Sequence, residues 1–196
     1  MSQPGTTHRG LLVVISGPSG AGKTTIARAV EQRLDAVFSV SATTRPRTAA
    51  DVEGRDYYFL SEPEFQRRVD AGEMLEYAQV FGRNWYGTPR APVERALTEG
   101  RLVILEIDVQ GGLQVRRAMP GALLIFIEPP SEDDLLRRLR ARGRDDEPAI
   151  QRRFAEARRE IETARSSGAY DHFIVNDDLD RAIDEACAVI ETARRG

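Results

Sequence analysis

Four short, continuous apolar runs stand out in a chain that is otherwise rich in charged residues. They read LLVVI (11–15), LVILEI (102–107), LLIFI (123–127) and HFIV (172–175). Runs that are apolar at consecutive positions are typical of strands buried on both faces, as in parallel sheets. The pattern therefore predicts strands of a parallel central sheet.

Apolar residues with helical spacing follow the first of these runs and the last. The two sets are Ile26, Val30 and Leu34, and then Leu179, Ile183, Cys187 and Ile190. Each set places its apolar residues on one face of a helix, and we expect Cys187 to pack there. Strands that alternate with such helices indicate βαβ units, so we predict a three-layer α/β/α core around the parallel sheet.

Two stretches interrupt this alternation. Residues 38–98 hold strand-like pieces around one short helix, which the capping-box pair Ser61 and Glu64 should begin and Gly72 should end. Residues 137–165 are charged nearly throughout, so this segment should bury little and move relative to the core. We predict a single domain over 1–196, with the core at about 10–37, 99–134 and 168–196, a strand-rich insertion at about 38–98, and a helical lid at about 135–167.

Composition narrows the classes of partner. The chain has 196 residues, 41% of them hydrophobic and 30% charged, which is ordinary for a soluble globular protein with one core. A formal net charge of −3 argues against a broad electrostatic interaction with nucleic acid or an anionic membrane. One cysteine permits no internal disulfide, which fits a reducing compartment. We expect a cytoplasmic protein without nucleic-acid or membrane partners.

Lys23 is the only lysine in the chain, and every other strongly basic residue is an arginine. It lies in GPSGAGKT (17–24), which fits the G-x-x-x-x-G-K-[ST] pattern directly after a strand and before a helix. The backbone N–H groups of such a loop surround a polyphosphate, the lysine bridges the outer phosphates, and Thr24 binds Mg²⁺. A compact ammonium fits this tight loop, whereas a planar guanidinium is too wide. The residues expected to bind the triphosphate are Gly17, Pro18, Ser19, Gly20, Ala21, Gly22, Lys23, Thr24 and Thr25.

A phosphate-binding loop alone is compatible with a switch, a motor or a kinase, and the acceptor chemistry decides between them. The two histidines, His8 and His172, are not placed as a general base. A phosphate acceptor needs none, because its second pKa of about 6 leaves it ionised at neutral pH. It needs charge neutralisation instead, which arginines in the two interrupting stretches would supply. These features favour a nucleoside monophosphate kinase.

Eight blocks of the sequence resemble guanylate kinase, and they occur in the order of that family. They are VSATTR (40–45), EGRDYYF (53–59), GEMLEYAQVFG (72–82), YGT (86–88), LEIDVQG (105–111), FIEPPS (126–131), RLRARGRDDE (138–147) and IVNDD (174–178). The resemblance covers nearly everything from Leu11 to the C-terminus. It implies transfer of the γ-phosphate of ATP to GMP, and also to dGMP, in purine nucleotide metabolism, with Mg²⁺ as the metal that accompanies ATP.

The resemblance also assigns an acceptor site. Ser41, Glu76 and Asp108 would face guanine, whose N1–H and amino group are donors that a carboxylate accepts, while adenine would present a lone pair at N1. The residues that the resemblance assigns to GMP are Ser41, Arg45, Arg47, Tyr57, Glu76, Tyr86, Gly87, Thr88 and Asp108.

The donor site follows from the same resemblance. The lid arginines Arg138, Arg142 and Arg153 would close over the transferring phosphate, and Asn176 matches a contact to adenine. Asp108 or Glu106, in LEID (105–108), would order waters on Mg²⁺ beside Thr24. The expected catalytic residues are Lys23, Arg45, Arg138, Arg142 and Arg153.

One departure from the family pattern affects the phosphate ligands. The family usually has T-T-R-x-P-R, and this chain has TTRPR. We still expect Arg47 to bind GMP with Arg45, because residues two apart in an extended run point the same way.

Two alternative functions stay open: a kinase of a sugar phosphate, and a non-catalytic interaction module, which the intact phosphate loop and the single-domain chain disfavour. Both a monomer and a small homo-oligomer fit the sequence.

Overall fold

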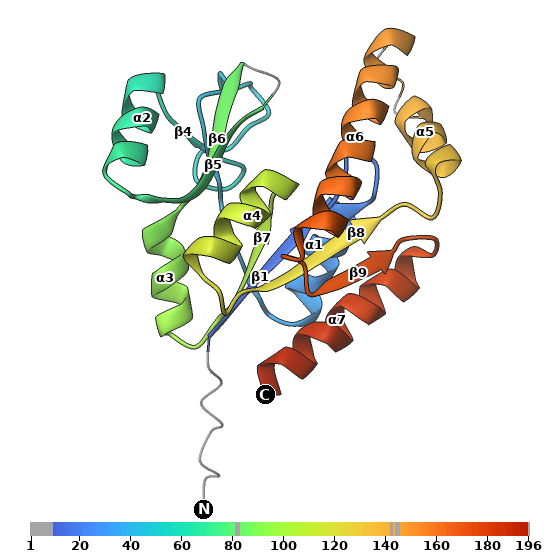
Figure 1. Ribbon diagram of the computed structural model, residues 1–196. Coiled ribbons are helices and arrows are strands. Elements are labelled where there is room, and N and C mark those ends of the chain that lie inside the picture. The colour runs from blue at the N-terminus through green and yellow to red at the C-terminus, as the bar shows by residue number, and fades with distance from the viewer. Residues whose placement is uncertain (1–9, 81–82, 142, 144–145, 196) are drawn as a thin grey trace, which may run out of the picture.

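A five-stranded parallel sheet forms the centre of the computed structural model, which describes residues 10–80, 83–141, 143 and 146–195 (Figure 1). Its strand order is β2-β7-β1-β8-β9, and every neighbouring pair is parallel. The strands are β1 (Leu11–Ser16), β2 (Val37–Phe38), β7 (Leu102–Glu106), β8 (Leu123–Glu128) and β9 (His172–Val175). The predicted α/β class with a parallel sheet is confirmed.

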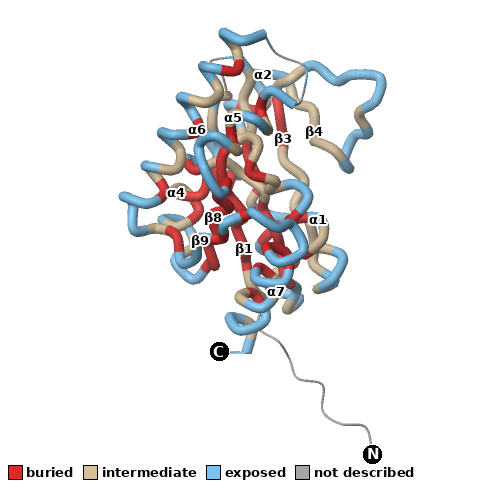
Figure 2. Tube along the Cα trace, turned by 90° about the vertical axis from the view of Figure 1, so that its right-hand side faces the viewer, coloured by how far each residue is buried: buried red, intermediate tan, exposed pale blue. Residues whose placement is uncertain are grey.

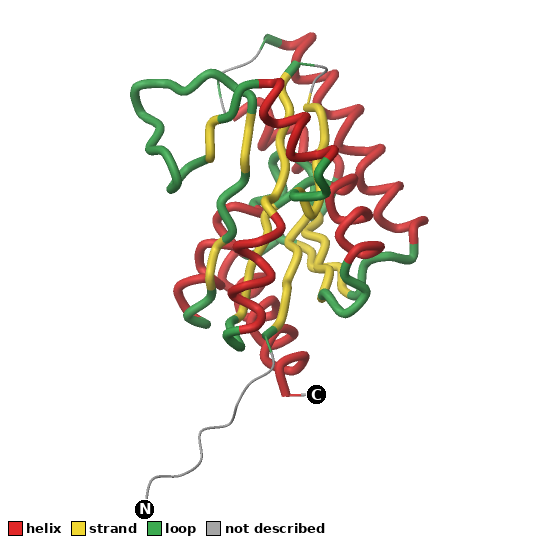
Figure 3. Tube along the Cα trace, turned by 90° about the vertical axis from the view of Figure 1, so that its left-hand side faces the viewer, coloured by secondary structure: helices red, strands yellow, loops and turns green. Residues whose placement is uncertain are grey.

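Helices cover both faces of this sheet because successive strand side chains point to opposite sides. Val13 and Ile15 pack with α1 (Lys23–Arg33) and α7 (Leu179–Arg195). Leu12 and Val14 pack with α3 (Arg90–Thr98), α4 (Val109–Ala118) and the end of α6 (Glu147–Ser167). Figure 2 shows the resulting buried interior around β1 and β8, and Figure 3 shows helices on either side of the strands. The three-layer arrangement is confirmed.

Two expectations about burial at the end of the chain are wrong. HFIV is β9, but it lies at the edge of the sheet, where Phe173 and Val175 are 38% and 40% exposed. Leu179 is also 40% exposed, because it is the first residue of α7 and the packing of this helix begins with Ala182 and Ile183. Cys187 packs against the core, partly buried, as expected.

A second, mixed sheet occupies the first interrupting stretch. Its order is β4-β3-β6-β5, built from β3 (Ala42–Thr43), β4 (Tyr58–Phe59), β5 (Met74–Val80) and β6 (Asn84–Pro89). Helix α2 (Glu62–Asp70) begins where predicted, since Ser61 Oγ accepts the N–H of Glu64 at 3.3 Å. The prediction of one helix in 38–98 is wrong, because α3 follows β6 directly. Its N-cap, Pro89, makes no side-chain capping hydrogen bond, so the sequence carries no start signal.

The second interrupting stretch forms α5 (Glu132–Ala141) and α6, which stand across from the insertion in Figure 1. The two helices share a small apolar cluster of Leu135, Leu139, Ile150 and Ala157. The base of α6 is tied to the central sheet, because Arg165 donates two hydrogen bonds of 2.8 Å to the buried carboxylate of Glu128 on β8. Within the described residues, no helix is long and apolar enough to cross a membrane.

Candidate functional site

A cavity of about 690 Å³ lies where the core, the insertion and α6 meet. The phosphate loop, residues 17–25, forms one wall together with residues 106–110 at the end of β7. Side chains of the insertion form a second wall, and α6 forms a third. This volume lies in the usual range for small-molecule sites. The sequence ranges that enclose it are far apart, so the cavity exists only in the folded chain.

The phosphate loop is held tightly against the sheet. Gly22, the N-cap of α1, has φ 94°, and a Cβ there would lie 2.3 Å from Asn176 Nδ2. Asn176 is buried and donates from Nδ2 to the carbonyl of Ala21 at 2.8 Å. A Cβ on Gly17 would likewise lie 2.3 Å from the carbonyl oxygen of Ile127. Glycine is therefore required at both positions, and the positive end of the α1 dipole lies at the cavity.

Lys23 and Thr24 both line the cavity, and each already has partners. The ammonium of Lys23 donates to the carbonyls of its own loop, at Gly17 and, at 3.1 Å, at Pro18. Thr24 Oγ1 donates to Glu106 Oε1 at 2.5 Å, which joins the start of α1 to the end of β7. Lys23 is thus folded back onto the loop, near the place where phosphates would bind.

The oxygen groups beside Thr24 fit Mg²⁺. Glu106 and Asp108 line the cavity with the Thr24 hydroxyl, and hydroxyl and carboxylate oxygens are the ligands this ion prefers. Across the part of the chain that is described, no group of three or more His, Cys, Asp or Glu residues forms a metal site. A hydroxyl and two carboxylates leave the remaining ligand positions of such an ion to phosphate and water oxygens.

Glu76 is a buried carboxylate in the cavity wall, on strand β5 of the insertion. It is 5% exposed, and its Oε1 accepts a 2.6 Å hydrogen bond from the Thr88 hydroxyl. Burial raises the pKa of Glu76 to about 7; the charge of Asp108 adds to this shift, and the Thr88 bond opposes it. Its Oε2 lies against Gly111 at the start of α4, where a Cβ would be 2.7 Å away. A side chain at 111 would therefore have to displace the Glu76 carboxylate from this position.

The three residues predicted to face guanine are brought together. All three line the cavity: Ser41 directly precedes β3, Glu76 is on β5, and Asp108 is the N-cap of α4. The Asp108 carboxylate also caps α4, accepting the N–H of Gly111 at 2.8 Å. Thr88, predicted to lie near the base, is itself buried and contacts Glu76.

The predicted phosphate ligands of the insertion also cluster, around a residue that sequence reasoning missed. Asp51 accepts two hydrogen bonds from Arg45, at 2.9 and 3.1 Å, and its carbonyl accepts one from Arg47 at 3.1 Å. Arg45 holds the pKa of Asp51 well below its usual range. The Arg45 guanidinium lies 5.4 Å from the ring centre of Tyr57, which meets Tyr86 edge-on in the cavity wall. An acid six residues after Arg45 is the only sequence signal for this contact.

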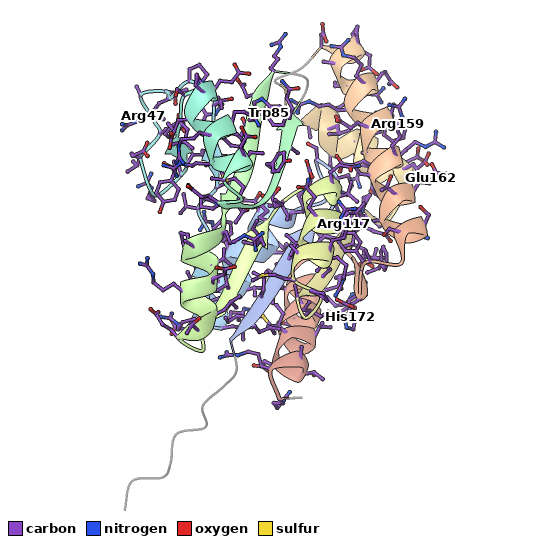
Figure 4. The ribbon with its side chains drawn as sticks, turned by 60° about the vertical axis from the view of Figure 1, so that its left-hand side comes forward. Arg47, Trp85, Arg117, Arg159, Glu162 and His172 are labelled. Atoms are coloured by element: carbon purple, nitrogen blue, oxygen red, sulfur yellow. The ribbon has the colours of Figure 1, made fainter. Side chains whose placement is uncertain are left out.

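The predicted lid arginines are spread over two helices. Arg138 on α5 donates to the carbonyl of Asn176 at 2.8 Å, beside the phosphate loop. Arg153 lies on α6, and Arg142 lies outside the described residues, as does His8. The residues of α6 that do line the cavity were missed in the sequence, although their helical spacing is visible there: Glu156, Arg159, Glu160 and Thr163. Figure 4 shows Arg159 on α6, across from Arg47 on the insertion.

Comparison with known proteins adds independent evidence. The guanylate kinase family model matches residues 9–193. The chain belongs to the guanylate kinase family. The resemblance seen in the sequence is thereby confirmed. A guanylate kinase of Symbiobacterium thermophilum is 48% identical over 183 residues, covering 93% of this chain and 85% of its own. A guanylate kinase of Gloeobacter violaceus is 50% identical over 174 residues, covering 88% of this chain and 83% of its own.

A solved structure leads to the same family. The crystal structure of a guanylate kinase from Anaplasma phagocytophilum matches with a TM-score of 0.77 at 33% identity. The match covers 96% of this chain and 88% of the other. Family membership therefore extends over the core, the insertion and the α5–α6 segment together.

Proposed function

We propose that this protein is a guanylate kinase that transfers the γ-phosphate of ATP to GMP and releases ADP and GDP. The observation that carries the proposal is that one cavity joins the phosphate loop around Lys23 to the buried carboxylate of Glu76. A phosphate loop by itself serves many nucleotide-binding proteins. A buried carboxylate in the wall of the same cavity selects a base with two adjacent donors, which is guanine.

Glu76, Ser41 and Asp108 form the proposed guanine site. The ionised carboxylate of Glu76 accepts from the N1–H and the amino group of the base, and Ser41 donates to O6. Adenine would set its N1 lone pair against the Glu76 carboxylate, and a buried mismatch of this kind rejects a substrate strongly. The hydroxyl of Thr88 holds the Glu76 carboxylate in place by its hydrogen bond.

The proposed site for the GMP phosphate is formed by Tyr57, Tyr86, Arg45 and Arg47. Gly87 lies between Tyr86 and Thr88 in the same strand. Asp51 supports this role, because it holds both arginines on the same loop before any phosphate is bound. The two tyrosine hydroxyls are suitable donors to a phosphate dianion, and a bidentate arginine is a strong partner for it.

The phosphate loop, residues 17–25, would bind the triphosphate of ATP through its backbone N–H groups and Lys23. Mg²⁺, held by Thr24 with waters ordered by Glu106 and Asp108, would neutralise charge between the two polyanions. Arg138, Arg142 and Arg153 would approach the transferring group when α5 and α6 (the lid) close. Asn176 would contact adenine in addition to its bond to Ala21.

A coupled assay with GMP, dGMP, AMP and a sugar phosphate as acceptors tests the proposal. We expect turnover with GMP, lower turnover with dGMP, and turnover near background with AMP and the sugar phosphate. Preference for AMP or the sugar phosphate would overturn the assignment. Binding of GMP without turnover would indicate a non-catalytic interaction module.

The cellular setting is part of the same proposal. We place this activity in purine nucleotide metabolism in the cytoplasm, with ATP and GMP as partners and without nucleic acid or membrane. The net charge of −3 and the presence of one cysteine support this placement. A monomer and a small homo-oligomer both fit.

A further inference from the structure

The cavity wall contains a guanidinium that has no part in the reaction described above. Arg159 is exposed and lines the cavity from α6, together with Glu156, Glu160 and Thr163. Residues three, four and seven positions apart lie on one side of a helix, so this side of α6 faces the cavity. Figure 1 shows α6 across from the insertion, and Figure 4 shows Arg159 on that helix.

Arg159 makes no ion pair or hydrogen bond within the described part of the chain. Two carboxylates, Glu156 and Glu162, lie three residues from it along α6, and pairs at this spacing are common on helices. The preceding residue, Arg158, does pair, with Glu132 of α5 at 2.9 Å. Arg159 is therefore a cation at the cavity for which the described chain supplies no partner.

The other charged groups of the cavity wall are mostly acidic. Five carboxylates line the cavity with two basic side chains; the acids are Glu76, Glu106, Asp108, Glu156 and Glu160, and the bases are Lys23 and Arg159. Lys23 already donates to the carbonyls of its own loop. Phosphates that enter a wall of this composition need further positive charge, and Arg159 provides it from the side opposite the insertion.

Arginines already assigned to phosphates have partners elsewhere in this structure. Arg45 and Arg47 both donate to Asp51, and Arg138 donates to the carbonyl of Asn176. These three arginines are not among the described residues that line the cavity. Arg159, by contrast, can bind a phosphate in the cavity without giving up an existing contact.

We propose that Arg159 binds a phosphate group of a nucleotide held in this cavity. The inference rests on the proposed function and adds a phosphate-binding residue to it. A guanidinium donates two parallel N–H bonds to phosphate oxygens, and such charge-assisted pairs are strong. The cavity extends from the phosphate loop to the insertion, so the phosphate belongs either to GMP or to ATP, and the experiment distinguishes the two.

Isothermal titration calorimetry of Arg159→Met tests this contact, because methionine keeps much of the side-chain length and removes the charge. The probes are GMP, ATP and a bisubstrate analogue in which phosphates join adenosine to guanosine. We expect the variant to bind the bisubstrate analogue about tenfold more weakly than the unmodified protein does. Guanosine and adenosine, which carry no phosphate, should bind both proteins equally. Arg159→Lys, which keeps a positive charge, should recover part of the loss.

The single nucleotides identify the phosphate. A similar loss with GMP but not with ATP assigns Arg159 to the acceptor, and the reverse assigns it to the donor. A loss confined to the bisubstrate analogue assigns it to the phosphates that meet when α5 and α6 close. The matched control is Arg158→Met, the same substitution one residue earlier, at an exposed ion pair outside the cavity wall. It should bind every probe as the unmodified protein does.

Other results would overturn the inference. An unchanged affinity for the bisubstrate analogue in Arg159→Met excludes the phosphate contact, and an equal loss with the nucleosides would mean that the residue only shapes the cavity. The same loss in Arg158→Met would reduce the effect to the general charge of α6. The Arg159 variants should fold, as a thermal unfolding curve checks, because this side chain is exposed and makes no pair. Failure of the proposed function is distinct, because the unmodified protein would then not phosphorylate GMP.

Discussion

Lys23 is held by the carbonyls of its own loop, and this arrangement limits which residue can replace it. An arginine keeps the charge, but its planar head is wider than an ammonium and does not fit the same loop. We expect Lys23→Arg to lower kcat about a hundredfold or more with little effect on the unfolding midpoint. The assay with GMP, together with a thermal unfolding curve, checks both parts. Near-normal kcat in Lys23→Arg would contradict this reason for the single lysine.

The buried carboxylate of Glu76 makes a prediction about pH. Its pKa is raised from 4.5 to about 7, so the neutral form is favoured in the folded protein. The associated stability is full below about pH 4.5 and is lost as pH rises through about 7, on the order of 3 kcal/mol. Glu160 acts in the same direction. In Glu76→Gln we expect the fall in stability between pH 4.5 and 8 to shrink by the contribution of Glu76, while the part due to Glu160 remains, as measured by urea unfolding at each pH.

The same titration affects GMP. A base that donates two hydrogen bonds binds the ionised carboxylate, so the affinity for GMP should rise as pH increases through 7, and Glu76→Gln should abolish that dependence. We expect the variant to lose about 2–4 kcal/mol in kcat/KM for GMP, with a much smaller change in the KM for ATP. If the use of GMP and the use of ATP were impaired equally in Glu76→Gln, Glu76 would have a structural role instead.

Arg45 and Arg47 differ in how firmly they are held. Arg45 makes two bonds to the Asp51 carboxylate and lies over Tyr57, whereas Arg47 makes one bond to the Asp51 carbonyl. Because Arg45 is the better-ordered guanidinium, we expect Arg45→Ala to raise the KM for GMP more than Arg47→Ala does. Kinetics of the two variants compare them directly. An Arg47→Ala variant that matches the unmodified protein would show that only one of these arginines binds GMP.

At the scale of elements, the anchor of α6 is the pair between Arg165 and Glu128. Glu128 is 4% exposed, so removing Arg165 leaves a buried carboxylate unpaired. We expect Arg165→Met to lower the free energy of unfolding by about 1–3 kcal/mol. Arg158→Met is the control, because its pair with Glu132 is exposed on both sides and should contribute less than about 1 kcal/mol. If urea unfolding showed the same loss of unfolding free energy in Arg165→Met and Arg158→Met, the special role of the Arg165–Glu128 pair would be contradicted.

The boundaries of the helices and strands show which local sequence signals are enough to predict an element. The Ser61 cap and the glycine after α2 are local, and α2 is found where they predict it. The helix α3 lacks such a cap and was missed. The strand β9 has the same apolar pattern as β1 and β8, but its place at the sheet edge leaves it half exposed. A pattern along one segment carries no information on what covers that segment.

At the scale of the whole molecule, α5 and α6 are joined to the core at the base of α6 and share their own cluster farther out. If this segment is a lid, it should close over both bound nucleotides. We expect amide hydrogen exchange at residues 150–160 to slow when a bisubstrate analogue binds, and to slow less at 164–167, where α6 is already fixed. Protection of residues 17–24 with unchanged exchange at 150–160 would reject lid closure.

The sequence by itself determined the α/β class, the phosphate loop and the family. Consecutive apolar residues, helical spacing and G-x-x-x-x-G-K-T are local patterns, and the family blocks follow one another along the chain. The family resemblance names Ser41, Glu76 and Asp108 together, and the fold brings all three to one cavity. The burial of Glu76 and its raised pKa depend on the folded chain and cannot be read from the sequence.

Only the tertiary structure decided the contacts between distant segments. The order β2-β7-β1-β8-β9 places β9 at an edge, Asp51 folds back onto Arg45, and Arg165 reaches Glu128. Glu160 belongs to the same class, since it lines the cavity only because of how α6 packs. Burial and charge environment are sums over neighbours that chain folding brings together, so no local pattern specifies them.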